Sequence, residues 1–125
     1  MAYPTAFRYT KEHEWVKIDG NRARIGITDH AQAELGDVVF VELPTVGADV
    51  KQGGLLGTVE SVKAVSDVYA PLSGKVIEAN RNLEQSPETV NQSPHDAGWI
   101  AVIQLSNPAE AGSLLDAAAY EALIA

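Results

Sequence analysis

The residue with the clearest potential for covalent chemistry is Lys63, which lies in a valine-rich segment between Gly57 and Pro71. A lysine amine can act as a Schiff-base nucleophile when desolvation lowers its pKa. It can instead be acylated when it projects from the fold, where a modifying enzyme can reach it. The valines recur every third residue, which favours a helix by periodicity, but β-branched residues favour strands by propensity. The residues alone therefore leave the local structure around Lys63 open.

The other candidates for site chemistry are the three histidines, His13, His30 and His95. They are too scattered along the chain to define a metal site, and we expect none. The chain has no cysteine, which excludes a disulfide framework, a thiolate zinc site and a cysteine nucleophile. Any sulfur chemistry must therefore come from an attached group. Neither a glycine-rich phosphate loop nor a Gly-x-Ser-x-Gly elbow is present.

The size and charge of the chain limit its partners. The 125 residues, 46% of them apolar and 21% charged, predict one folded domain over residues 1–125. With 17 acidic and 9 basic residues the net charge is -8, which disfavours nucleic acid and anionic membranes. The segment Met1–Thr5 opens without the basic and apolar regions of a signal peptide, so we expect a cytoplasmic protein. We also expect a monomer.

The body of the chain, about residues 7–105, consists of short apolar runs separated by Gly, Pro and Asn, which predicts a strand-rich sandwich or barrel. Alternating residues predict a hairpin from strands at 14–18 and 22–27. Thr28 or Asp29 can cap a short helix over 29–35, which Gly36 can end. The continuous apolar run at 38–41 predicts a strand in the core rather than at a sheet edge.

The C-terminal segment, about residues 108–124, changes to an Ala- and Leu-rich composition that predicts a helix. Leu114, Leu115, Ala118 and Ala119 have helical spacing. The helix is too short to be stable alone in water, so we expect it to dock on the strand-rich body.

Several motifs give the chain a close resemblance to the H-protein family of the glycine cleavage system, whose members carry lipoate. The most specific motif is Val-Glu-Ser-Val-Lys-Ala, with Lys63 as its lysine and Ser66-Asp67 downstream. The resemblance extends over nearly the whole length, through His13-Glu14-Trp15, Ile25-Gly26-Ile27-Thr28-Asp29-His30-Ala31-Gln32, Leu35-Gly36-Asp37, Val41-Glu42-Leu43-Pro44, Tyr69-Ala70-Pro71, Ser73-Gly74 and Gly98-Trp99.

The resemblance implies a mostly β fold, a barrel-sandwich hybrid of two small sheets with a short internal helix and a C-terminal helix. It places Lys63 at the tip of a hairpin, with lipoic acid joined to its amine through an amide bond. The lysine and lipoyl chains together give a reach on the order of 10 to 15 Å. The protein would be a carrier and not an enzyme.

The resemblance also implies the partners. A glycine decarboxylase would load an aminomethyl group on the arm, an aminomethyltransferase would take it, and dihydrolipoyl dehydrogenase would reoxidise the arm. A lipoate ligase, or a lipoyl or octanoyl transferase, would attach the arm itself.

A cleft beside the arm is expected to protect the aminomethyl cargo. An amine and a sulfur on one carbon fall apart when the amine lone pair expels thiolate, and protonation of the amine removes that lone pair. A cleft that offers carboxylates to the ammonium and excludes water would therefore lengthen the life of the loaded intermediate. Within the resemblance, Glu14 and Asp67 are the candidates, and Glu12 and Glu34 occupy positions that contribute to the same cleft.

Three kinds of alternative stay open, and the first is another swinging-arm domain, either a biotin carrier or a lipoyl domain of a 2-oxoacid dehydrogenase. A biotin carrier has methionines on both sides of its lysine, whereas Lys63 has Val62 and Ala64. The lipoyl domains of 2-oxoacid dehydrogenases are shorter and show Asp-Lys-Ala. A Schiff-base enzyme would need a desolvated Lys63, whereas a turn tip is wet. Sequence scarcely distinguishes an H-like protein that relays lipoate to other enzymes from a carrier of the glycine cleavage system. A partner-dependent glycine exchange assay would distinguish the two.

Overall fold

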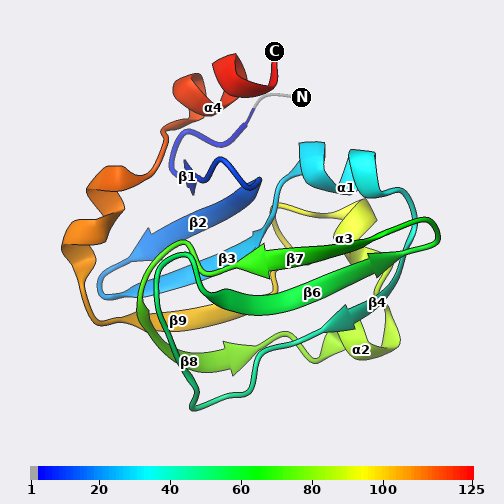
Figure 1. Cartoon of the computed structure of the whole chain (residues 1–125), viewed down its shortest axis with the longest axis horizontal. Coiled ribbons are helices and arrows are strands. Elements are labelled where there is room, and N and C mark those ends of the chain that lie inside the picture. The colour runs from blue at the N-terminus through cyan, green and yellow to red at the C-terminus, as the bar shows by residue number, and fades with distance from the viewer. Residues whose placement is uncertain (1–2) are drawn as a thin grey trace.

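The computed structural model describes residues 3–125 as a mostly β protein with two antiparallel sheets and short helices (Figure 1). The larger sheet contains, in spatial order, β1 (Arg8–Tyr9), β2 (Glu14–Asp19), β3 (Arg22–Ile27), β9 (Ala101–Leu105), β8 (Gly74–Ala79) and β5 (Asp49–Val50). The smaller sheet contains β4 (Val38–Glu42), β6 (Leu55–Ser61) and β7 (Val65–Tyr69). The helices are α1 (Asp29–Leu35), α2 (Asn82–Gln85), α3 (Thr89–Gln92), the 3-10 helix η1 (Pro108–Ser113) and α4 (Ala117–Ile124).

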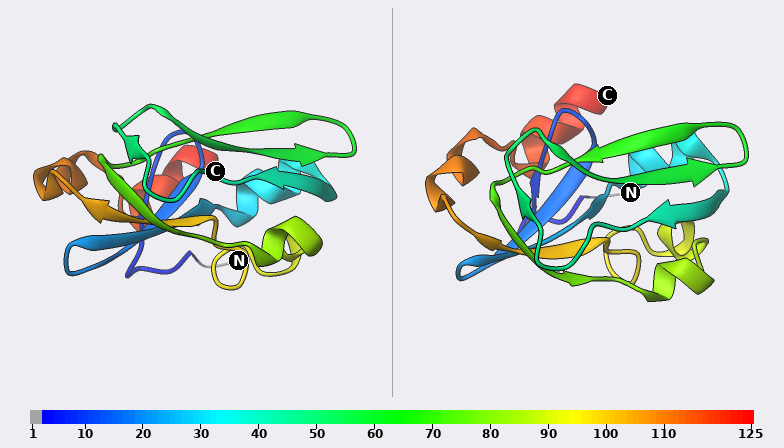
Figure 2. Two further views of the ribbon diagram at one scale, coloured as in Figure 1. Left: turned by 90° about the horizontal axis from the view of Figure 1, so that it is seen from below. Right: turned by 60° about the horizontal axis from the view of Figure 1, so that its bottom comes forward.

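The two sheets lie as layers over a common apolar core (Figure 2). Val16, Ile25 and Ile103 contribute from the larger sheet, and Val41 and Val59 contribute from the smaller one. The mostly β fold with two small sheets that the sequence predicted is confirmed. Each sheet has its own strand order, so the strands do not need to close into a barrel. Within residues 3–125, no helix is long and apolar enough to cross a membrane.

The β2–β3 hairpin and α1 form where local sequence signals predict them. Val16 pairs with Ile25 across the hairpin, and Gly20 takes a positive φ of 64° in its turn. The side chain of Thr28 caps α1 by accepting the N–H of Ala31 at 3.2 Å. Gly36 ends the helix at a φ of 81°, a conformation that glycine adopts without steric cost.

The prediction that residues 38–41 form a core strand is wrong. β4 is an edge strand of the smaller sheet, with Val38 and Val41 buried but Val39 and Phe40 50% and 49% exposed. The register shifts between Val38 and Phe40, so the strand buries only part of its apolar run. An apolar run indicates that a segment favours a strand, but it does not indicate whether that strand has neighbours on both sides.

The predicted C-terminal helix is interrupted. Leu114 and Leu115 lie between η1 and α4, where Leu115 exchanges backbone hydrogen bonds with Tyr9, each 2.8 Å long. Asp116 then caps α4 through the N–H of Ala119 at 2.8 Å. Docking on the body is confirmed, but α4 buries Ala117 and Tyr120 rather than the alanines at 118 and 119.

Candidate functional site

Lys63 lies at the exposed tip of the hairpin formed by β6 and β7. The side chain of Ser61 organises this turn, because its hydroxyl accepts the N–H of Lys63 at 3.3 Å and that of Ala64 at 3.1 Å. The backbone of Ser61 also donates to the carbonyl of Ala64 at 2.8 Å. Ser61 is 6% exposed. A buried hydroxyl with several partners therefore fixes the turn that presents the lysine.

The segment around Lys63 contains neither Asn-Gly nor Asp-Gly, the usual signals of a tight hairpin, so the turn and the role of Ser61 were not predicted from the residues alone. A serine hydroxyl that bonds to backbone N–H groups two and three residues ahead is a recognised local turn signal. That signal was present in Ser61-Val62-Lys63-Ala64.

The hairpin tip rests on the junction between α1 and β4. The N–H of Val62 donates to the carbonyl of Asp37 at 3.0 Å. A Cβ placed on Gly36 would lie 3.6 Å from Cε of Lys63, so the lysine stem passes beside the C-terminal end of α1. Asn91 secures the junction by donating to the carbonyl of Gly36 and accepting the N–H of Val38, both at 2.8 Å. Lys63 is therefore exposed, at a hairpin tip that hydrogen bonds hold against the body.

Glu14 is buried at the start of β2, with 2% of its surface exposed. One carboxylate oxygen accepts the hydroxyl of Thr10 at 2.5 Å, and the other accepts the backbone N–H of Tyr69 at 3.1 Å. Burial raises the pKa of Glu14, the two hydrogen bonds oppose that shift, and the charge of Glu12 adds to it. Glu14 thus joins the larger sheet to the hairpin that carries Lys63.

Three of the expected carboxylates gather around Tyr69. Asp67 lies two residues before it on β7 and accepts its hydroxyl at 3.5 Å, a long hydrogen bond. The pKa of Tyr69 is raised, first by the charge of Asp67, then by burial, and further by the charges of Glu12 and Glu14. Asp67 is exposed, unlike Glu14. The surface at this end of β7 is therefore acidic.

A surface pocket of about 210 Å³ lies beside Tyr69 and includes Glu12 and Glu14 in its lining. Lys63, Asp67 and Glu34 are outside that lining. Asp67 is four residues from Lys63, which is at most about 13 Å at the ~3.3 Å per residue of extended chain. That distance matches the expected reach of the arm.

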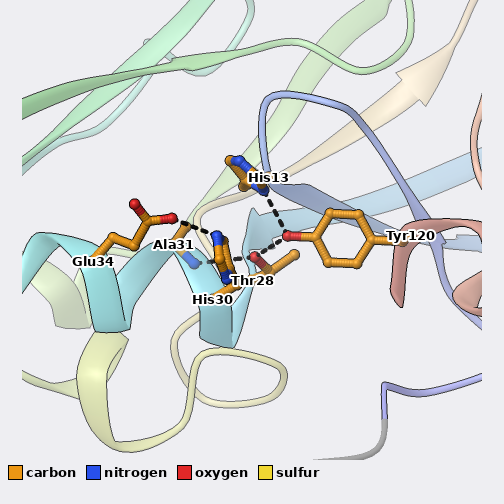
Figure 3. Close-up of polar contacts among 6 residues, drawn as sticks. All are labelled: His13, Thr28, His30, Ala31, Glu34 and Tyr120. Atoms are coloured by element: carbon orange, nitrogen blue, oxygen red, sulfur yellow. Dashed lines mark hydrogen bonds and ion pairs between the residues drawn. The ribbon is translucent and has the colours of Figure 1, made fainter. Parts of the chain in front are cut away.

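Glu34, the fourth expected carboxylate, lies on α1 and contacts Nε2 of His30 with its Oε1 (Figure 3). The ring of His30 lies 4.8 Å from that of His13, whose Nδ1 is 2.8 Å from the hydroxyl of Tyr120. The structure therefore brings together His13 and His30, which the sequence predicted to be too scattered to share a site. The stretch from Thr28 beside His13 to Gly36 beside Lys63, which contains α1, is about 12 Å long at a helical rise of about 1.5 Å per residue.

His13, His30 and Glu34 are also the residues that come nearest to a metal-binding set in residues 3–125. Their ligand atoms lie within 4.8 Å of one another. Two ligands of one zinc ion lie at most about 4.2 Å apart, which is twice the Zn–N distance of about 2.1 Å. An ion would fit there only after side chains move, and Tyr120 already engages one nitrogen of His13.

Two antiparallel sheets that present an exposed lysine on a hairpin tip, beside an acidic surface, are the features expected of a carrier domain with an arm on that lysine. Comparisons with known proteins agree with this class. The sequence model of the glycine cleavage H-protein family matches residues 7–125. The chain belongs to the glycine cleavage H-protein family, and it is a lipoyl carrier, a non-catalytic component of the glycine cleavage system.

Individual relatives are similar over nearly their whole length. The glycine cleavage system H protein of Brevibacillus brevis is 56% identical over 124 residues, which cover 99% of this chain and 98% of that one. The H protein of Symbiobacterium thermophilum is 59% identical over 119 residues, covering 95% and 93%. The crystal structure of a glycine cleavage system H protein from Mycobacterium marinum aligns with a TM-score of 0.88 at 40% identity, covering 96% and 97%.

Proposed function

We propose that Lys63 is the residue that carries lipoic acid, as an amide on Nζ. The observation that carries this proposal is the place of Lys63 at the exposed tip of a turn that Ser61 and Asp37 hold by hydrogen bonds. The remaining lysines, Lys11, Lys17, Lys51 and Lys75, lie outside this hairpin. A ligase needs an accessible amine, and a carrier needs a fixed pivot, and this position supplies both.

When attached, lipoate supplies a disulfide that can accept an aminomethyl group and two electrons. The residues of the chain fit that group, because acidic side chains lie within its reach on both sides of the hairpin. Asp67 lies along β7, and Glu34 lies on α1, whose C-terminal end at Gly36 is beside the lysine stem. Glu12 and Glu14 lie further along, around Tyr69.

The carboxylates have different parts in this proposal. Asp67 is exposed and within reach of the arm, so it can approach the ammonium of the cargo as a charge. Glu12 is also exposed and adds negative charge to the same surface. Glu14 is buried and engaged by Thr10 and Tyr69, so it acts at the base of the pocket and orients the end of β7. Holding the amine protonated withdraws the lone pair that would expel the sulfur. Glu34 lies on α1, nearer to Lys63, and would border the arm if the arm lay along that helix.

We further propose that the cargo passes from glycine decarboxylase to aminomethyltransferase, and that dihydrolipoyl dehydrogenase reoxidises the arm. A lipoate ligase, or a lipoyl or octanoyl transferase, would modify Lys63. Membership in the family supports this set of partners. The cytoplasmic location and the monomeric state expected from the sequence stay predictions, which cell fractionation and analytical ultracentrifugation would test.

The deciding experiment is incubation of the purified protein with lipoate, ATP and a lipoate ligase, followed by intact mass and peptide mapping. One lipoyl group is expected, on the peptide that contains Lys63, and the formal net charge should change from -8 by one further negative unit. The Lys63→Arg variant should remain unmodified, and Lys51→Arg is the matched control that should be modified normally. A lipoyl group on another lysine, or none on the wild type, would contradict the assignment.

A further inference from the structure

The backbone of His13 is the starting point for an inference that rests on the proposed acidic site. Within residues 3–125, His13 is the one non-glycine residue with a positive φ, at 70°. Such a conformation is unfavourable for a residue with a Cβ and persists where the surroundings enforce it. His13 lies between Glu12 and Glu14, so its conformation decides how these two carboxylates are directed.

The surroundings that enforce this conformation come from α1 and α4. The hydroxyl of Tyr120 lies 2.8 Å from Nδ1 of His13 and 2.7 Å from Oγ1 of Thr28 (Figure 3). The carbonyl of His13 accepts the N–H of Thr28 at 3.0 Å. His13 is thus held through both its side chain and its backbone.

One proton arrangement gives both contacts of the Tyr120 hydroxyl a donor and an acceptor. Thr28 accepts the N–H of Ala31, so its own hydroxyl hydrogen needs an acceptor, which the oxygen of Tyr120 provides. Tyr120 then donates to Nδ1 of His13, which places the proton of the neutral imidazole on Nε2. The groups that face His13 from the neighbouring elements are His30, Glu34 and Glu12.

Tyr120 is itself rigidly placed. It is fully buried, and its ring stacks on Tyr9 at 4.9 Å and meets Tyr3 edge to face at 5.3 Å. Position 120 is 107 residues away from His13 in the sequence. We infer that Tyr120 is a positioning residue of the acidic site: its hydroxyl holds His13 in the left-handed conformation and thereby directs Glu12 and Glu14 toward Tyr69. α4 is then part of the site and not only a cover for the core.

The first test compares Tyr120→Phe with Tyr9→Phe, both of which keep a buried ring and remove one hydroxyl. The hydroxyl of Tyr9 donates to the carbonyl of Pro4 at 2.8 Å, away from His13. Tyr120→Phe should speed release of ammonia and formaldehyde from isolated, aminomethyl-loaded protein about three- to tenfold, the range that one ordinary hydrogen bond supports. Tyr9→Phe should leave release within twofold of the wild type. Equal acceleration in both variants, or none in Tyr120→Phe, would overturn the inference.

The second test examines the backbone route directly. Glycine adopts a φ near 70° without steric cost, whereas alanine retains the strain after losing the Tyr120 contact. His13→Ala should therefore speed release, His13→Gly should do so less, and Tyr120→Phe should add nothing in the His13→Gly background. Persistence of the Tyr120→Phe effect in that background would overturn the route through His13. This comparison of alanine with glycine also serves if Tyr120→Phe does not fold.

A measurement on unlipoylated protein separates this inference from the proposed function. The imidazole nitrogen resonances of His13 and the amide resonances of Glu12 and Glu14 should move in Tyr120→Phe and not in Tyr9→Phe. If these resonances stay in place, the positioning role is wrong. If they move while Glu14→Gln and Asp67→Asn both leave release unchanged, the proposed acidic site fails and the structural link from Tyr120 to His13 stands.

Discussion

The carboxylate of Glu14 accepts the backbone N–H of Tyr69 at 3.1 Å, which joins β2 of the larger sheet to the end of β7 in the smaller sheet. A buried charge-assisted hydrogen bond of this kind is stronger than a neutral one. It ties the hairpin that carries Lys63 to the body at the end opposite its tip. The tip is held separately, through Val62 and Asp37. The hairpin is therefore anchored at both ends, as the proposed attachment of a flexible arm to Lys63 requires.

Lys63→Arg should leave the fold intact and abolish every lipoyl-dependent step. An exposed residue at a turn tip contributes little burial, so we expect a change in the free energy of unfolding within about 0.5 kcal/mol. Arginine keeps the positive charge but does not accept the lipoyl amide. Urea denaturation and a reconstituted glycine cleavage assay would measure the two effects. A large loss of stability would show that Lys63 has a structural role.

Asp67→Asn should shorten the life of the aminomethyl-loaded protein. The substitution keeps the shape of the side chain and removes the charge that attracts the cargo ammonium. Loss of one charge-assisted hydrogen bond, worth about 1.5 to 3 kcal/mol, corresponds to release faster by roughly 10- to 100-fold. Ammonia and formaldehyde release would be followed without folate or transferase. Glu78→Gln on β8 is the matched control, since it removes the same charge from the other sheet, and an equal effect there would reject a local role.

Glu14→Gln should speed release in the same assay, because it removes a negative charge from the base of the pocket. It should also change how stability depends on pH. Burial raises the pKa of Glu14 above 4.5, so the folded protein binds this proton more tightly than the unfolded chain does. The contribution of Glu14 to stability therefore falls as the pH rises from about 4.5 through the folded pKa. A glutamine can still accept the N–H of Tyr69 and donate to the hydroxyl of Thr10.

We accordingly expect Glu14→Gln to be at least as stable as the wild type at pH 7, with the difference shrinking toward pH 4.5. Urea midpoints at both pH values would show this. A variant that is markedly less stable at pH 7 than at pH 4.5, relative to the wild type, would mean that the ionised carboxylate stabilises the fold.

His95→Gln should reduce the loss of stability on acidification. Burial lowers the pKa of His95 below 6.5, and its Nε2 accepts the N–H of Asp29 at 3.0 Å only when unprotonated. The unfolded chain takes up this proton below pH 6.5 and the folded protein resists it, so stability falls as the pH drops through that window. Glutamine keeps an acceptor and does not titrate.

Urea denaturation at pH 7.5 and 5.5 would compare His95→Gln with the wild type. Part of the pH dependence should remain, because burial lowers the pKa of His13 as well. An unchanged pH dependence in His95→Gln would show that the His95 contact contributes nothing to acid sensitivity.

Ser61→Ala should loosen the tip of the hairpin without unfolding the sheet. Its hydroxyl accepts the N–H groups of Lys63 and Ala64, and their loss costs about 1 to 3 kcal/mol locally. Hydrogen exchange at Lys63 and Ala64 should accelerate, while exchange at Val59 in β6 should change little. Ser66→Ala, on β7, is the control, and equal exchange in the two variants would show that the Ser61 hydroxyl does not order the turn.

The sequence by itself determined the elements whose signals are local. Thr28 and Gly36 delimit α1 because a side-chain cap and a left-handed glycine act within a few residues of the helix. The β2–β3 hairpin follows from alternating residues on both sides of a two-residue turn. The family motif around Lys63 carried the functional prediction, since the valine spacing there could not choose between helix and strand.

Only the tertiary structure decided features that depend on residues distant in sequence. β4 is an edge strand with two exposed apolar residues, because the elements that pack beside a strand determine its burial and its apolar run does not. Glu14 became a buried link because β7 brings the N–H of Tyr69 to it. Tyr120 reached His13 because α4 packs back on the N-terminal strands. Such contacts are chosen by the packing of the whole chain, so no local pattern of residues specifies them.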